Sequence, residues 1–192
     1  SGKSEELIRL LKRAVIAGQN VLALKPSIDN RYSEGEIASH SKILYSCVTF
    51  SSESELREIL NSDLMKGVNV IGIDEGQFVT KGFVDDLKIL VSKDKRVIIS
   101  GLDKDYLGNP FGIMPSLMAM SDRSIKLSAI CVNTPDAFKI CGRDATMTYR
   151  LSSSDTGSIV QVGERDSYEA RCRSCWNIGM LATNRMNFNK CA

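Results

Sequence analysis

The sequence predicts an α/β fold in which helices cover both faces of a mostly parallel sheet. Two observations predict it: helical patterns alternate along the chain with short strand-like runs, and several of these runs are continuously apolar. Strands that are buried on both faces, as in parallel sheets, read as continuous apolar runs. The composition agrees, since 43% of the 192 residues are hydrophobic and 25% are charged, which excludes a disordered or collagen-like chain.

The expected elements can be placed in order along the chain. Apolar residues at helical spacing predict a helix from Glu5 onward, and Gly18 supplies its stop signal. Ser52 and Glu55 have the spacing of a capping box at the start of another helix. Residues 27–41 are polar and turn-rich, as expected of a long functional connection. The other elements are helices at 52–61, 82–91 and 114–120, and strands at 20–24, within 42–50, and at 68–73, 96–100 and 125–130.

The character of the chain changes after Cys131. From there the segments are short, rich in Thr, Ser, Arg and Gly, and bracketed by cysteines. We therefore expect two domains: an α/β domain over residues 1–130 and a small β-rich domain over residues 131–192.

Charge and hydropathy exclude several classes of partner. The chain has 25 Lys and Arg against 23 Asp and Glu, a net charge of +2, which gives no electrostatic case for binding nucleic acid. The longest apolar run is shorter than the roughly 18 residues that a membrane span needs. The start of the chain lacks the pattern of an export signal, so a cytoplasmic location is expected. Cysteines in that compartment are free thiols or metal ligands more often than disulfides.

The start of the first helix has the ending of a phosphate-binding loop. Gly2-Lys3-Ser4 matches the last three positions of Gly-x-x-x-x-Gly-Lys-Ser/Thr. A helix N-terminus offers backbone N–H groups and a positive dipole end, both of which suit phosphate. Lys3 would reach the β- and γ-phosphates of ATP, and the Ser4 hydroxyl would bind Mg²⁺. A chance helix start is the alternative for so short a match.

A second feature supports a nucleotide site. The apolar run Val70–Ile73 ends in Asp74 and Glu75, at the edge where α/β sheets bind ligands. P-loop enzymes place a Mg²⁺-binding Asp at that position. Two solvated acids at a strand end are the alternative, but both motifs together favour binding of Mg²⁺-ATP.

The cysteines form a candidate zinc site. Cys172 and Cys175 make a Cys-x-x-Cys pair, and Cys131 and Cys141 lie some thirty to forty residues earlier. Four thiolates suit tetrahedral Zn²⁺. Nine residues separate Cys131 from Cys141, more than zinc knuckles usually have, so a redox pair or unrelated core cysteines are alternatives. Cys47 and Cys191 are expected outside the site.

Six groups of residues carry a resemblance to a known family, in chain order from residue 1 to about 176. They are Ser1–Ile8, Asp29–Ser33, Ile73–Phe78, Gly101–Lys104 with Pro110–Gly112, Lys126–Cys131, and Tyr168 with Cys172–Cys175. With them the chain resembles the thymidine kinases of the cytosolic, zinc-containing type (type II). The combination of Asp-Glu-Gly-Gln-Phe with Leu-Asp…Pro-Phe-Gly is specific to this family.

The resemblance implies a fold and a reaction. The fold would be a P-loop NTPase-like sheet domain followed by a small zinc-binding, β-rich lasso domain. The reaction would be ATP-dependent phosphorylation of thymidine to dTMP in nucleoside salvage, with deoxyuridine as a related substrate and a homotetramer as the assembly. Glu75 would act as general base on the 5′-hydroxyl, Arg31 would stabilise charge on the transferred phosphoryl group, and Asp74 would hold Mg²⁺, largely through water.

The resemblance also implies binding residues. Phosphate and Mg²⁺ would be bound by Ser1, Gly2, Lys3, Ser4, Asp74 and Gln77. The thymine base would be lined by Phe78, Leu102, Tyr106 and Phe111, for which plain core packing is the alternative. The base edge would be read by a loop with Ile159, Gln161, Val162 and Gly163, followed by Tyr168. Zinc would be bound by Cys131, Cys141, Cys172 and Cys175.

Three features depart from the family pattern. The first half of the phosphate loop and the strand before it do not precede Ser1, so the chain is expected to begin within the motif. As it stands it should bind ATP weakly and turn over little thymidine, and roughly ten to twenty upstream residues should restore both. The spacer Val132–Ile140 lengthens the first cysteine pair, and Gly163-Glu164 stands where the family has Gly-Gly.

Two other functions fit the same motifs. One is a P-loop phosphotransferase or ATPase with a different acceptor, which a panel of nucleosides would distinguish. The other is a non-catalytic zinc-ribbon interaction module on a degenerate P-loop core, which would bind zinc without transferring phosphate.

Overall fold

The computed structural model describes residues 1–27, 36–38, 43–135, 139–151 and 167–183. The chain divides into two compact units, which are described separately. The larger unit contains Gly2–Asp103 and Phe111–Ser124, and the smaller contains Ser1, Lys104–Pro110 and Ile125–Ala192. The division into domains at residue 130 stays a prediction.

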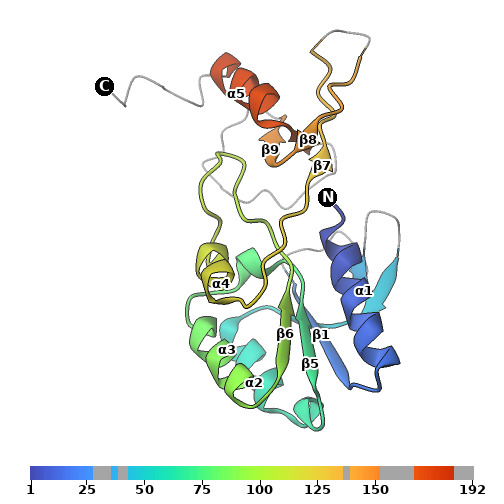
Figure 1. Cartoon of the computed structure of the whole chain (residues 1–192). Helices are drawn as coiled ribbons and strands as arrows, with labels where there is room; N and C mark the ends of the chain where they lie inside the picture. Colours follow the sequence, from blue (N-terminus) through green and yellow to red (C-terminus); the bar gives the residue numbers. More distant parts are fainter. Residues whose placement is uncertain (28–35, 39–42, 136–138, 152–166, 184–192) are drawn as a thin grey trace. The chain divides into compact units, whose positions relative to one another are not determined.

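A four-stranded parallel sheet forms the centre of the larger unit (Figure 1). Its order is β4 (Val48–Phe50), β1 (Val21–Pro26), β5 (Val70–Ile73) and β6 (Arg96–Ile99). Leu22 pairs with Ile71, and Ile71 with Val97, so β5 is flanked on both sides. The parallel sheet expected from the apolar runs is thereby confirmed.

Helix α1 (Lys3–Ile16) covers one face of this sheet (Figure 1). Its buried stripe of Leu7, Ile8, Leu11 and Ala14 packs in one cluster with Ala23 and Val70 of the strands. A Cβ atom at Gly72 would lie 2.8 Å from the side chain of Leu11, so glycine there allows the helix to approach the strand closely. The helix ends at Ile16 with Ala17 as its C-cap, and Gly18 follows with a φ of 74°, as its stop signal predicts.

Three helices cover the opposite face. They are α2 (Glu53–Asn61), α3 (Phe83–Ser92) and α4 (Met114–Met120), which are joined in one core cluster with the alternate strand residues Leu22, Leu24, Ile71 and Ile73. Because neighbouring strand residues point to opposite faces, both faces of the sheet are buried, as predicted.

The larger unit also contains shorter elements. Short 3₁₀ turns lie at Asp63–Met65 (η1) and Gly76–Phe78 (η2), and β2 (Glu36–Ala38) pairs antiparallel with β3 (Leu44–Ser46).

The predicted capping box at α2 forms in modified form. Ser52 is the N-cap, and its hydroxyl accepts a hydrogen bond from the backbone N–H of Glu55 at 3.2 Å. The Glu55 carboxylate does not return to Ser52, however. It accepts from the backbone N–H and the hydroxyl of Ser51, one residue earlier, at 2.7 and 2.6 Å. These bonds hold the pKa of Glu55 below its usual value.

Among its described residues, the smaller unit contains two short antiparallel strand pairs and a helix. β7 (Ala129–Ile130) pairs antiparallel with β8 (Asp144–Ala145), and β9 (Met147–Arg150) pairs with β10 (Tyr168–Arg171). The strand expected at 125–130 is therefore wrong over its first four residues, because β8 offers it a partner for only two. The β-rich expectation also missed α5 (Arg173–Ala182), which begins directly after β10.

Candidate active site and metal centre

The carboxyl ends of β5 and β6 meet the start of α1 at Asp74. This aspartate follows β5, is only 3% exposed, and accepts a hydrogen bond from the Ser4 hydroxyl at 3.1 Å. A second hydroxyl, that of Ser100 after β6, donates to its other carboxylate oxygen. Two residues 70 positions apart, each predicted from its own motif, are thus in direct contact. Ser100 was missed, although a polar residue directly after the neighbouring parallel strand is a recognisable signal.

The other predicted phosphate residues lie at the N-terminus of α1. Gly2 is the N-cap with a φ of 71°, and its carbonyl oxygen accepts from the N–H of Glu6 at 2.9 Å. Lys3 and Ser4 form the first turn of the helix, and Ser1 precedes the cap at an exposed position. This is the end of a helix that attracts phosphate.

Glu75 is half-buried and held by a neighbour. Its φ of 53° lies in the left-handed region, which non-glycine residues rarely adopt outside functional or strained positions. The side-chain amide of buried Gln77 donates to the Glu75 carboxylate at 2.5 Å, and its oxygen accepts from the Leu102 N–H at 3.0 Å. Gln77, which was assigned to phosphate and Mg²⁺, therefore orients Glu75 and the backbone of Leu102 in this structure.

Three of the residues predicted to line the base belong to the larger unit. The rings of Phe78 and Phe111 meet edge to face, with centroids 5.8 Å apart and planes at 83°. Leu102 is tied to the same region through Gln77. All three side chains are half-buried, and none belongs to the main core clusters. Their surroundings thus differ from plain core packing.

Tyr106 and Tyr168 belong to the smaller unit, where both face one cation. The guanidinium carbon of Arg150 lies 4.9 Å from the ring centroid of Tyr106 and 5.9 Å from that of Tyr168. Arg150 is 1% exposed and pairs with Tyr168 in the β9–β10 ladder. Both distances fall within the range of cation–π attraction. Arg150 was not singled out from the sequence, since nothing local marks a strand arginine as buried.

Several predicted residues lie outside the described part of the chain. They are Arg31, Ile159, Gln161, Val162 and Gly163, together with Cys191. Their roles stay predictions.

The four predicted zinc ligands form one cluster in the smaller unit. The sulfur atoms of Cys131, Cys141, Cys172 and Cys175 all lie within 4.8 Å of one another. Zinc–sulfur bonds of about 2.3 Å in a tetrahedron require sulfurs about 3.8 Å apart, and the sulfurs of Cys141 and Cys172 are 3.9 Å apart. The donor set and its dimensions therefore fit structural zinc.

Backbone hydrogen bonds close the loop formed by the nine residues between Cys131 and Cys141. The N–H of Cys141 donates to the carbonyl of Asn133 at 2.8 Å, and the N–H of Gly142 donates to that of Cys131 at 3.1 Å. A third bond runs from the N–H of Cys131 to the carbonyl of Arg143 at 2.8 Å. Together they bring the two cysteines together at the base of the loop, so the long spacing does not prevent a metal site.

The other pair sits at the start of α5. Cys172 is the N-cap, and its sulfur accepts from the N–H of Cys175 at 3.5 Å. Both side chains are buried. Cys47, in the larger unit, lies outside the cluster as predicted, and burial raises the pKa of its thiol to about 11.

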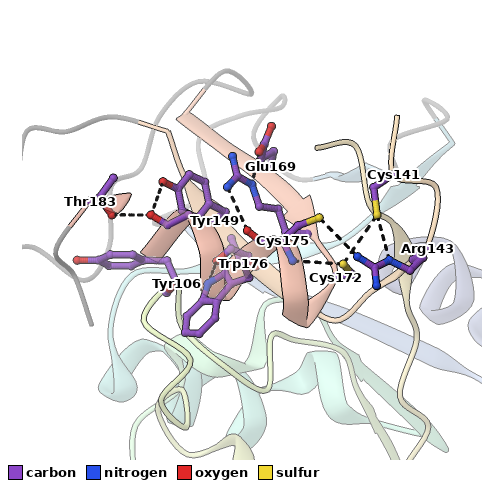
Figure 2. A network of polar contacts seen from close by, with 12 residues as sticks. Tyr106, Cys141, Arg143, Tyr149, Glu169, Cys172, Cys175, Trp176 and Thr183 are labelled. Atoms are coloured by element: carbon purple, nitrogen blue, oxygen red, sulfur yellow. Dashed lines mark hydrogen bonds and ion pairs between the residues drawn. The ribbon is translucent and has the colours of Figure 1, made fainter. Parts of the chain in front are cut away.

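Arg143 contacts the cluster from the exposed side (Figure 2). Its Nε donates to the sulfur of Cys141 at 3.2 Å, and its Nη2 approaches that of Cys175 at 3.9 Å. The guanidinium lowers the pKa of Cys141 to about 6, whereas burial raises that of Cys175 to about 11. A bound metal ion would itself favour the thiolate form of each ligand. Arg143 was not predicted from the sequence, although it stands two residues after Cys141.

Among the helices of the described ranges, none has the length and apolar character to cross a membrane.

A comparison with known families identifies the family of the chain. A family model described as thymidine kinase matches residues 1–176 of the 192. The matched region includes the Ser4–Asp74 contact, Glu75 and all four clustered cysteines, and a cysteine cluster of this kind is consistent with the zinc-containing type II enzymes. The chain therefore belongs to the thymidine kinase family.

Proposed function

We propose that this protein transfers the γ-phosphoryl group of ATP to the 5′-hydroxyl of thymidine, with Glu75 as general base, and so produces dTMP and ADP. Phosphorylation of thymidine is the activity of the family to which the chain belongs. The observation that carries the finer proposal is the contact between Ser4, at the N-terminus of α1, and buried Asp74. We place the reaction in the cytoplasm and expect a homotetramer, as the family suggests.

The α1 terminus and Asp74 bind the phosphates and their metal ion. Lys3 and the N-terminal amides of α1 attract the β- and γ-phosphates. The Ser4 hydroxyl and the Asp74 carboxylate supply the oxygen ligands that Mg²⁺ prefers. Mg²⁺ held by these two residues would neutralise charge as it develops during transfer.

Glu75 accepts the proton that the nucleoside loses. As the 5′-oxygen bonds to the γ-phosphorus, its proton passes to the Glu75 carboxylate, and the bond from the γ-phosphorus to the β–γ bridging oxygen breaks to release ADP. The amide of Gln77 supports this role, because it fixes the carboxylate at 2.5 Å. Arg31 stabilises the charge on the phosphoryl group. Most of the rate enhancement comes from positioning and electrostatics.

Each unit offers apolar or aromatic side chains for the thymine ring: Phe78, Leu102 and Phe111 in the larger unit, and Tyr106 and Tyr168 in the smaller. The edge-to-face pair of Phe78 and Phe111 suits a flat base, since aromatic rings pack favourably edge-on and offset. Backbone groups of the loop containing Ile159, Gln161, Val162 and Gly163 read the polar edge of the base.

Zinc has a structural role at the four cysteines. A closed set of four thiolates leaves no open coordination position, as is typical of structural sites. Metal analysis of the purified protein should therefore find one zinc ion per chain, and replacement of Cys172 with Ser should abolish it.

A nucleoside panel tests the function. The complete product of the gene is incubated with Mg²⁺-ATP and with thymidine, deoxyuridine or deoxycytidine, and the nucleoside monophosphates are quantified. The proposal expects ATP-dependent dTMP formation, activity on deoxyuridine, and little on deoxycytidine. ATP hydrolysis without transfer to any nucleoside would contradict the proposal and favour an ATPase.

A further inference from the structure

The segment Lys104–Pro110, which contains Tyr106, is held by the only tryptophan of the chain. The indole Nε1 of Trp176 (Figure 2) in α5 donates to the carbonyl oxygen of Tyr106 at 3.1 Å. It also donates to the carbonyl oxygen of Thr148 in β9 at 3.1 Å. Trp176 is 3% exposed. A buried donor shared by two carbonyl groups joins the segment to the hairpin beside it, and all three residues belong to the smaller unit.

The two residues that follow Tyr106 lie at the apolar cluster that contains Trp176. Leu107 lies against this cluster of Met147, Tyr149, Trp176 and Met180. Gly108 has a φ of 83°, and a Cβ atom there would lie 3.1 Å from the indole ring. The indole therefore binds the backbone of Tyr106 and closely approaches Gly108, while Leu107 packs on the cluster to which the indole belongs. The ring of Tyr106 is supported separately by Arg150.

The position of Trp176 depends on the cysteine cluster. It directly follows Cys175, and its backbone N–H donates to the carbonyl of Cys172 at 2.9 Å. Both cysteines are ligands in the first turn of α5 or at its cap. The metal site thus fixes the same helical turn from which the indole projects.

We propose that Trp176 is a positioning residue for thymidine recognition, and that zinc acts on substrate binding through it. The inference rests on the proposed function, in which Tyr106 contacts the base. Zinc bound by the four cysteines orders the first turn of α5, the turn places the indole, and the indole holds the backbone of Tyr106. The metal site then sets the affinity for thymidine in addition to stabilising the fold.

A purely structural role for Trp176 makes different predictions. If the indole only filled a core, its replacement would lower the stability of the smaller unit, with no selective effect on one substrate. If Trp176 has a positioning role, its replacement should raise the KM for thymidine while kcat and the KM for ATP stay nearly constant, since the ATP residues lie on other elements. The replacement should also increase the local mobility of residues 104–110 in particular.

The variant Trp176→Phe separates the two, because it keeps an aromatic ring but removes the N–H donor. Loss of a buried hydrogen bond should raise the KM for thymidine about five- to tenfold, with little change in kcat or in the KM for ATP. Amide hydrogen exchange should accelerate in residues 104–110, and the protein should still contain one zinc ion per chain. Ile178→Ala, at an exposed position of the same helix, is the matched control and should change none of these quantities.

Zinc removal tests, without any activity measurement, whether the metal site controls the position of Trp176. Trp176 is the single tryptophan, so its fluorescence reports on this site alone. A chelator should shift the emission to longer wavelength and accelerate exchange in residues 104–110, and zinc should reverse both changes. Removal of zinc with unaltered exchange in that segment would overturn the coupling.

The outcomes remain distinguishable from those of the proposed function. A wild-type protein that phosphorylates no thymidine overturns the proposed function and with it the role in recognition, whereas the exchange and fluorescence measurements still decide whether Trp176 holds the segment. Thymidine turnover with an unchanged KM in Trp176→Phe overturns the inference alone. If this variant does not fold, Leu107→Ala is used instead, because it removes the packing of the segment against the cluster that contains Trp176. It must raise the KM for thymidine selectively for the inference to stand.

Discussion

At the scale of single residues, the site is organised by hydrogen bonds to two adjacent acids. Asp74 accepts hydrogen bonds from the hydroxyl groups of Ser4 and Ser100, and Glu75 accepts one from the side-chain amide of Gln77. Each acid is thereby held in one orientation. Ser100 lies 26 residues from Asp74, on the loop after another strand, which explains why the acids were predicted from their local motif while Ser100 was not.

Ser4→Ala tests the contact between α1 and Asp74. Removing a hydroxyl that hydrogen-bonds to a carboxylate weakens an interaction of about 1.5–3 kcal/mol. We expect the Mg²⁺ concentration for half-maximal activity to rise about tenfold or more, as follows from that energy. Titration of Mg²⁺ at saturating ATP measures it, with Ser54→Ala, at an exposed position in α2, as the control. An unchanged Mg²⁺ requirement would remove Ser4 from the metal site.

Arg143→Ala tests the outer side of the zinc cluster. The guanidinium donates to two of the four sulfurs, and loss of such partners typically weakens metal binding about 10- to 100-fold. Zinc transfer to a chromogenic chelator should accelerate accordingly in this variant. Arg96→Ala, at an exposed position of β6, is the comparison. Equal rates of zinc loss in both variants would show that Arg143 contributes nothing to the site.

At the scale of elements, the local patterns predicted most helices and strands, but not how they end or pair. The helical and strand periods depend on side-chain type alone, so α1, α2, α3, α4 and β5 were found to within two residues. The strand at 125–130 was overextended because pairing depends on a partner, and β8 is two residues long. Helix α5 was missed because the Cys-x-x-Cys motif was interpreted only as a metal knuckle, although Cys172 also caps the helix.

The close approach of α1 to β5 is a further element-level feature that can be tested. Gly72→Ala would place a methyl group 2.8 Å from the Leu11 side chain, and overpacking of this kind costs about 1–3 kcal/mol of unfolding free energy. Leu11→Ala alone should cost about 2–5 kcal/mol through the cavity that it leaves. Because the two side chains meet, the double variant should be less destabilised than the sum. Denaturant unfolding of the four proteins measures this coupling, and strict additivity would contradict the packing described.

At the scale of the whole molecule, the chain combines an α/β unit that contains the phosphate residues with a smaller unit that contains the zinc cluster. The cysteine set was predicted from its residue types, since four cysteines in two pairs suffice to suggest zinc. The closure of the nine-residue spacer could not be predicted, because the backbone hydrogen bonds from Cys141 to Asn133 and from Gly142 to Cys131 do not depend on side-chain identity. The roles of Arg150 and Trp176 likewise arise only when distant strands and helices meet.

The central claim is that Glu75 removes the proton of the nucleoside as phosphate is transferred, and the turnover of Glu75→Gln tests it most directly. The amide is nearly isosteric with the carboxylate but cannot act as a base. We expect kcat for dTMP formation to fall roughly 10²- to 10⁴-fold, while the affinity for ATP, measured by equilibrium binding, stays within about twofold. Glu58→Gln, at an exposed position of α2, should keep full activity. A Glu75→Gln enzyme that turns over thymidine at a near wild-type rate would contradict the account.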